Sequence, residues 1–138
     1  MKILTALALS LALVSPIMVS PVMISPVMAE DAVSLVGTWS GHRERMAKVE
    51  GWRDGNATLV ITEQKGMTFK GHLSRANPDG DVDEGLWGAF TPGGHLMVGS
   101  DEEGIYSFDL VDADTLDYCY VEAGASPRAV CARLARQK

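Results

Sequence analysis

The stretch Thr115-Leu-Asp-Tyr-Cys-Tyr-Val-Glu122, with Arg128-Ala-Val-Cys-Ala-Arg-Leu134 after a short break, alternates apolar and other residues along both arms. Strict alternation is the period of a β-strand with one buried face, so the stretch predicts a β-hairpin. One register places Cys119 opposite Cys131 and Asp117 opposite Arg133. The same register forms three apolar pairs: Leu116 with Leu134, Tyr118 with Ala132, and Tyr120 with Val130. A shift of one residue would break every one of these pairs, so we expect this register.

The N-terminal segment has the pattern of a secretory signal peptide. Lys2 precedes an uncharged apolar run, and a low-complexity Ser-Pro-x-Met repeat follows at residues 15–28. The small residues at its end predict cleavage after Ala29. We therefore expect a signal peptide at 1–29, a single domain at 30–138, and a periplasmic or secreted protein. The alternative is an uncleaved membrane anchor, because no charge occurs between Lys2 and Ala29; the prolines and the cleavage site argue against it.

The distribution of charge restricts the partners of the chain. It carries 18 acidic and 12 basic residues, a formal net charge of −6. Between Arg75 and Arg128 there are twelve Asp and Glu residues and no Lys or Arg. Such a surface repels phosphate backbones and anionic lipids, so we expect no nucleic-acid partner and, after signal cleavage, no membrane partner. Two cysteines in an exported chain predict one disulfide, Cys119–Cys131, and we expect no metal and no cofactor.

Short alternating segments between turns predict eight strands and no helix. The first begins at Leu35 and continues to about Val49 as an exposed, charged arm, and residues 51–56 read as a loop. The other expected strands are 57–63, 67–73, 84–90, 95–100, the stretch between the Asp101 and Asp112 turns, and the two arms of the hairpin described above. Eight short strands joined by short turns predict an all-β protein, an eight-stranded antiparallel up-and-down β-barrel, in which closure removes the exposed edges.

The turns also predict which residues face each other. The expected pairs are Ile61 with Phe69, Leu59 with Gly71, Val98 with Phe108, Leu96 with Leu110, Leu110 with Leu116, and Phe108 with Tyr118. The inward rows of these separate hairpins agree, which favours one continuous meander. The interior of an eight-stranded barrel is filled by side chains or holds one small ligand.

The tripeptide Gly37-Thr38-Trp39, early in the mature chain, resembles the first strand of calycin-type barrels, which include the avidin and lipocalin groups. In those proteins a Gly-x-Trp packs the tryptophan across the closed end of the barrel. The resemblance implies a structural role for Trp39. The later tryptophans and biotin-contacting residues of the avidin group have no clear matches here, since only Trp52 and Trp87 remain and Trp52 reads as a loop residue. The resemblance therefore extends to the architecture and not to biotin.

An acidic loop places Asp79, Asp81 and Asp83 at alternate positions. Calcium loops use such oxygen ligands, but the spacing of glycine and glutamate that an EF-hand needs is absent. We expect a solvated acidic loop, with weak calcium binding as the alternative.

Catalytic motifs are missing from the sequence. The three histidines are scattered, and no nucleophile elbow or phosphate-binding glycine loop occurs. Asp109 should face Asp117 on the outer surface with Arg133 beside them, which predicts a structural ion cluster rather than an acid/base pair. We therefore expect a protein that is not an enzyme.

The interior is the more informative place to look for a site. We expect it to be lined by Trp87, Tyr106, Phe108, Tyr118 and Tyr120, with Arg43 at its mouth. Buried tyrosine hydroxyls need hydrogen-bond partners, which can be other side chains, water or a ligand. The leading interpretation is an exported barrel that binds a small, partly apolar ligand without catalysis. The alternative is a protein-interaction module, such as an inhibitor of a hydrolase.

Overall fold

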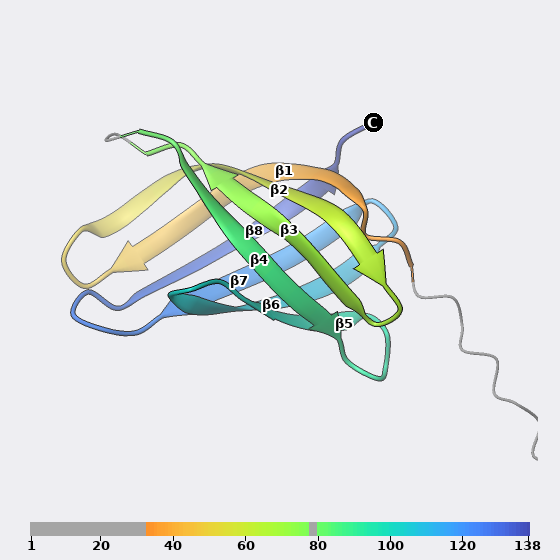
Figure 1. The fold of residues 1–138 in the computed structure, drawn as a ribbon. Coiled ribbons are helices and arrows are strands. Elements are labelled where there is room, and N and C mark those ends of the chain that lie inside the picture. The colour runs from red at the N-terminus through yellow and green to blue at the C-terminus, as the bar shows by residue number, and fades with distance from the viewer. Residues whose placement is uncertain (1–32, 78–79) are drawn as a thin grey trace, which may run out of the picture.

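The computed structural model describes residues 33–77 and 80–138, and the predicted signal peptide and Asp79 lie outside these ranges. The described residues form eight strands: β1 (Gly37–Ala47), β2 (Gly51–Lys65), β3 (Thr68–Arg75), β4 (Val82–Phe90), β5 (Leu96–Ser100), β6 (Gly104–Asp112), β7 (Thr115–Glu122) and β8 (Arg128–Arg136). Each strand pairs antiparallel with the next, and β8 pairs with β1 to close the barrel (Figure 1). The predicted fold class is confirmed. No helix long and apolar enough to cross a membrane occurs in the part of the chain that is described.

The β7–β8 hairpin has the predicted register. Cys119 lies opposite Cys131, and the two form a disulfide. Asp117 lies opposite Arg133, whose Nε and Nη2 each donate to its carboxylate at 2.7 Å. Asp109 of β6 lies opposite Asp117, as expected, so this outer row pairs two acids with one arginine. The hydrogen bond to Arg133 is the main cause that lowers the pKa of Asp117.

Removing the disulfide should weaken the fold measurably. Replacing Cys119 and Cys131 together with serine is expected to lower the free energy of unfolding by about 2–3 kcal/mol, because the closed loop is short and constrains the unfolded chain only modestly. Urea unfolding of the variant beside oxidised and reduced wild-type protein measures this effect. Reduced wild type should match the variant; an unfolding midpoint equal to that of the oxidised protein would contradict the prediction.

The first hairpin differs from its prediction. The range 51–56 is not a loop: β1 and β2 pair without interruption from Gly37 with Ile61 to Ala47 with Gly51, so Trp52 is an exposed strand residue. The charged part of β1 is not an exposed arm either, because Arg43 and Arg45 lie inside the barrel. Their inward position follows from the strand period, since both lie at even spacing from the buried Trp39.

Two predicted registers are wrong. A bulge between Ile61 and Glu63 shifts the β2–β3 ladder, so Ile61 lies opposite Gly71 instead of Phe69, and Leu59 opposite Leu73. On β5, Met97 rather than Val98 lies opposite Phe108.

The reason for the second shift is the Asp101 turn. The Asp101 carboxylate accepts hydrogen bonds from the backbone N–H groups of Glu103 and Gly104, so this residue caps the turn and Ser100 pairs with Ile105. The one-residue shift turns the Met97 side chain into the core, where only 1% of the residue's surface is exposed. Val98 and Leu96 point outward and are 55% and 45% exposed. The pairs Leu110 with Leu116 and Phe108 with Tyr118 are as predicted.

The barrel interior is apolar at the end where β1 begins and β8 ends. Trp39 lies there, fully buried, and its indole N–H donates to the Leu35 carbonyl at 3.0 Å. The guanidinium of Arg136 stacks over the indole, 4.0 Å from the ring centroid. Arg136 also donates to the carbonyls of Ser34 and Val36, which holds the segment before β1 across this end. These contacts close one end of the barrel.

Candidate functional site

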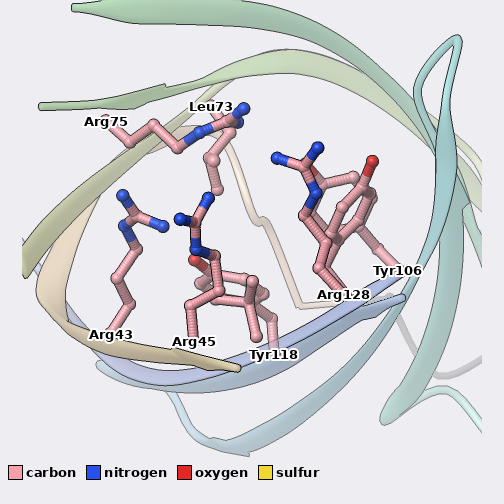
Figure 2. A pocket seen from close by; sticks show the side chains of 9 residues that line it. Arg43, Arg45, Leu73, Arg75, Tyr106, Tyr118 and Arg128 are labelled. Atoms are coloured by element: carbon pink, nitrogen blue, oxygen red, sulfur yellow. The ribbon is translucent and has the colours of Figure 1, made fainter. Parts of the chain in front are cut away.

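The opposite end of the barrel interior is polar. β1, β3, β5 and β7 end here, and the strand that follows each of them begins here. The inward side chains at these strand ends carry charges or hydroxyls. A small cavity of about 10 Å³ lies among nine residues: Arg43, Arg45, Leu73, Arg75, Tyr106, Tyr118, Tyr120, Arg128 and Val130. Figure 2 shows the four arginines projecting around one space inside the barrel. A cavity of this volume holds about one water molecule, so a larger ligand has to displace the arginine side chains.

Two of the four arginines are balanced by acids of the chain. Both terminal nitrogens of Arg75 donate to the Glu84 carboxylate, with the Nη2–Oε1 distance at 2.6 Å. Burial alone would lower the pKa of Arg75, but the hydrogen bond and the charge of Glu84 raise it overall. Arg128 Nε lies 3.1 Å from Glu122 Oε2, so the two side chains form an ion pair. The geometry at Nε does not meet that of a hydrogen bond. The arginines of both pairs line the cavity.

The other two arginines have no acidic partner among the described residues. Arg43 and Arg45 are each only 6% exposed. Arg43 Nη2 donates a long hydrogen bond of 3.4 Å to the carbonyl of Ala76. Three other buried nitrogens have no hydrogen-bond partner among the described residues: Nε of Arg43, and Nε and Nη2 of Arg45. Burial is the main cause that lowers the pKa of both guanidinium groups. An arginine keeps its proton in proteins, so both sites stay positively charged.

Three tyrosines, Tyr106, Tyr118 and Tyr120, line the cavity. The Tyr106 hydroxyl donates to Asp101 Oδ2 at 3.2 Å, and the Tyr120 hydroxyl lies 3.2 Å from Glu122 Oε2 and 3.4 Å from Asp101 Oδ1. Gly104 makes room for Tyr120, because a Cβ there would collide with the phenol ring. Burial raises the pKa of all three phenols, that of Tyr118 to about 12 with Arg43 opposing the rise. All three therefore remain protonated at neutral pH, and the hydroxyls of Tyr106 and Tyr120 act as hydrogen-bond donors.

The structure brings four of the predicted interior residues to this cavity: Arg43, Tyr106, Tyr118 and Tyr120. Phe108 lies deeper, stacked on Tyr106 with ring centroids 5.6 Å apart, in the apolar core. The prediction that Trp87 lines the interior is wrong, because Trp87 is 55% exposed on the outer face of β4 and its neighbour Leu86 points inward.

The sequence prediction missed the charged residues of the two ion pairs, Arg75, Glu84, Arg128 and Glu122, and also Arg45. The signal for Arg45 was present, because it shares the inward parity of Trp39 along β1. The signal for Arg75 and Glu84 was that they lie near the facing ends of two adjacent paired strands, β3 and β4. Leu73 lies opposite Glu84, so their side chains point to the same face, and Arg75 is two residues further along that face.

Other polar groups of the described residues lie in hollows outside the barrel interior, such as one of about 230 Å³ beside Asp83, Trp87 and Glu102. His42 pairs with Asp54 at 3.5 Å on the outer surface, and His72 lies 4.0 Å from Asp83. Within residues 33–77 and 80–138, no group of three or more His, Cys, Asp or Glu side chains is placed to hold a metal ion. The calcium prediction involves Asp79, which lies outside those residues.

Comparisons with known proteins establish the fold. No family model matches the chain, and no curated protein matches its sequence. Among solved structures, a redesigned β-barrel superposes with a TM-score of 0.58 at 15% identity, over 80% of this chain and 98% of that one. The S-type phycobiliprotein lyase CPES from Guillardia theta superposes with a TM-score of 0.55 at 8% identity, over 75% of this chain and 89% of that one. The structure of EF1p2_mFAP2b bound to DFHBI superposes with a TM-score of 0.55 at 14% identity, over 80% of this chain and 99% of that one. These likenesses show a small β-barrel.

Proposed function

We propose that this protein binds a small, partly apolar molecule in the polar end of its barrel without changing it chemically. The observation that carries the proposal is the set of buried donors on Arg43 and Arg45 that the described residues leave without acceptors. An unsatisfied buried polar group costs about 1–3 kcal/mol, and more when it is charged. A bound molecule that supplies acceptors removes this cost, and the aromatic and aliphatic wall suits its apolar part.

Several features support binding without catalysis in an exported protein. The three phenols hold their protons, and the inward carboxylates of Glu84 and Glu122 are paired with arginines, so none of these groups is poised to act as a base. The disulfide supports an oxidising compartment such as the periplasm or the extracellular space. The buried position of Trp39 across one end supports the resemblance to calycin-type barrels. The likeness to EF1p2_mFAP2b, which is bound to DFHBI, supports a small-molecule partner.

Blocking the cavity should remove the ligand. Native mass spectrometry of the protein purified from its own cells is expected to show an added small-molecule mass. Ala132 lies opposite Arg43 and points inward, so Ala132→Phe should lose that mass because the ring fills the space next to the cavity. Overpacking typically costs about 1–3 kcal/mol, so the comparison is made on protein that circular dichroism shows to be folded.

The control for this experiment is Ala135→Phe, an exposed position on the same strand, which should keep the added mass. If a folded Ala132→Phe protein keeps the added mass, the ligand binds outside the barrel. If wild-type protein shows no added mass and has no affinity for the aromatic probes described below, the proposed function is rejected.

A second function, contact with another protein, is favoured by the outer surface. Trp52, Met46, Val121 and Ile105 are all more than half exposed. Trp52 lies opposite Met46, and Ile105 opposite Val121, with Ala129 joining the two pairs in one cross-strand row. Contiguous exposed apolar rows mark interaction surfaces. If the protein is a hydrolase inhibitor, it should inhibit one enzyme of a hydrolase panel. Met46→Ser should weaken that inhibition. Thr62→Ser, at an exposed position on the far part of β2, should not.

A further inference from the structure

We infer that the ligand of this cavity is an organic oxyanion, held through its carboxylate or phosphate-type group by Arg43 and Arg45. This inference rests on the proposed function and adds the chemical class of the ligand. It is carried by a different observation, the charge balance of the polar end of the barrel.

The charges that face this interior do not cancel. Arg75 and Arg128 are matched by Glu84 and Glu122, one acid to each arginine. Asp101 is the other carboxylate that contacts the interior hydroxyls, and it is engaged by the backbone N–H groups of its own turn and by Tyr106. Arg43 and Arg45 take part in no ion pair with the residues described, so four arginines face three carboxylates and one positive charge is in excess.

A third cation without an ion pair among the described residues lies at the rim. Arg53 of β2 lies directly opposite Arg45 of β1, and residues directly opposite in a ladder point to the same face. Arg53 is exposed, and its charge is the second cause, after burial, that lowers the pKa of Arg45. Like charges directly opposite each other are destabilising in a sheet. The net charge of the whole chain is −6, so this local concentration of cations runs against the overall composition.

Structural needs alone do not explain Arg43 and Arg45. A buried charge without a partner is costly, and apolar side chains of similar volume often replace buried charged groups without loss of stability. A guanidinium group presents a fork of N–H donors that matches the two oxygens of a carboxylate or a phosphate. An oxyanion between Arg43 and Arg45 supplies both the acceptors and the negative charge that are missing.

The surroundings of the two arginines fit such a group. Both project inward from alternate positions of one strand, so their Cα atoms are about 7 Å apart. Gly55 and Ala132, the residues opposite Arg43 on the two neighbouring strands, are small and leave space beside it. Tyr118 lines the same cavity, keeps its proton and can donate a further hydrogen bond. Leu73 and Val130 offer apolar contact to the rest of the ligand.

A matched pair of fluorescent probes tests the inference. Anilinonaphthalenesulfonate carries an oxyanion, and N-phenylnaphthylamine has the same rings without it. Wild-type protein should bind the sulfonate at least about tenfold more tightly, since one charge-assisted hydrogen bond contributes enough free energy for that ratio. Arg43→Met and Arg45→Met should each reduce the preference to about twofold or less. Arg133→Met, which removes an arginine from the outer surface, should leave the preference unchanged.

Displacement then identifies the source of the oxyanion. Benzoate and phenyl phosphate are expected to displace the bound sulfonate, whereas benzyl alcohol is not. The anion that displaces the sulfonate at the lower concentration shows whether the site prefers a carboxylate or a phosphate. Added salt should weaken binding of the sulfonate to wild-type protein and not that of the neutral probe. This measurement needs no variant, so it holds even if an arginine variant fails to fold.

The possible outcomes separate the inference from the proposed function. If the neutral probe binds as tightly as the sulfonate, or if the preference survives in both arginine variants, the oxyanion inference is overturned while small-molecule binding stands. If neither probe binds and no ligand co-purifies, the proposed function is rejected and the inference with it. A preference that is lost in both inner variants and kept in Arg133→Met supports the inference.

Discussion

The free energy of unfolding should fall by about 3–5 kcal/mol when Trp39 is replaced by alanine. The indole is fully buried, and its N–H donates to the Leu35 carbonyl. Its removal therefore leaves a large cavity and an unmatched carbonyl at the closed end. It also removes the ring on which the Arg136 guanidinium stacks. Because Arg136 anchors the segment before β1, we expect this segment to lose order together with the barrel end.

Equilibrium urea unfolding, followed by far-ultraviolet circular dichroism, measures this loss. The control is Trp87→Ala, which removes the same kind of side chain from a position that is 55% exposed. Surface substitutions usually change stability by less than about 0.5 kcal/mol, so the two variants should differ severalfold in their effect. If Trp39→Ala and Trp87→Ala unfold at the same urea concentration, then Trp39 does not close the barrel.

The β7–β8 hairpin could be predicted residue by residue because several constraints select one register. Cys119 and Cys131, Asp117 and Arg133, and three apolar pairs all agree, and any shift breaks them together. The closed barrel followed from the same reasoning applied to the neighbouring turns. The sequence therefore specifies the architecture most clearly where polar and apolar residues alternate without interruption.

The β5 strand could not be placed in the same way. Leu96, Met97 and Val98 are all apolar, so alternation gives no phase, and the Asp101 turn decides which of them points inward. Leu86 and Trp87 on β4 present the same ambiguity, and only one of two neighbouring residues can face the core. The structure buries the leucine and exposes the tryptophan. A run of apolar residues thus predicts a strand without fixing which face is buried.

The candidate site was only partly predictable because a polar interior gives no hydrophobic signal. His42, Arg43, Glu44 and Arg45 are all polar, so their pattern reads as an exposed arm unless the parity of Trp39 is carried forward along β1. The three tyrosines were found because each alternates with outward residues in a strand of known phase. The missed arginines come from three strands, and their convergence depends on closure of the barrel, which places β8 beside β1.

The four interior arginines should separate into two classes when their stability effects are measured. Glu84→Leu removes the carboxylate that both terminal nitrogens of Arg75 contact. The two side chains are only 14% and 21% exposed, so this change leaves a largely buried cation without a partner. Breaking a buried pair from one side is strongly destabilising, and we expect a loss of about 3–4 kcal/mol.

Arg45→Met should have the opposite sign or no effect. Arg45 has no acidic partner among the described residues, and two of its nitrogens lack acceptors there, so an apolar side chain of similar length removes a cost instead of a contact. Urea unfolding of ligand-free protein compares the two variants directly. If Arg45→Met loses as much stability as Glu84→Leu, then Arg45 belongs to the framework of the fold. If it loses none while the affinity for the anionic probe falls, the arginine serves the ligand, at the expense of the stability of the empty barrel.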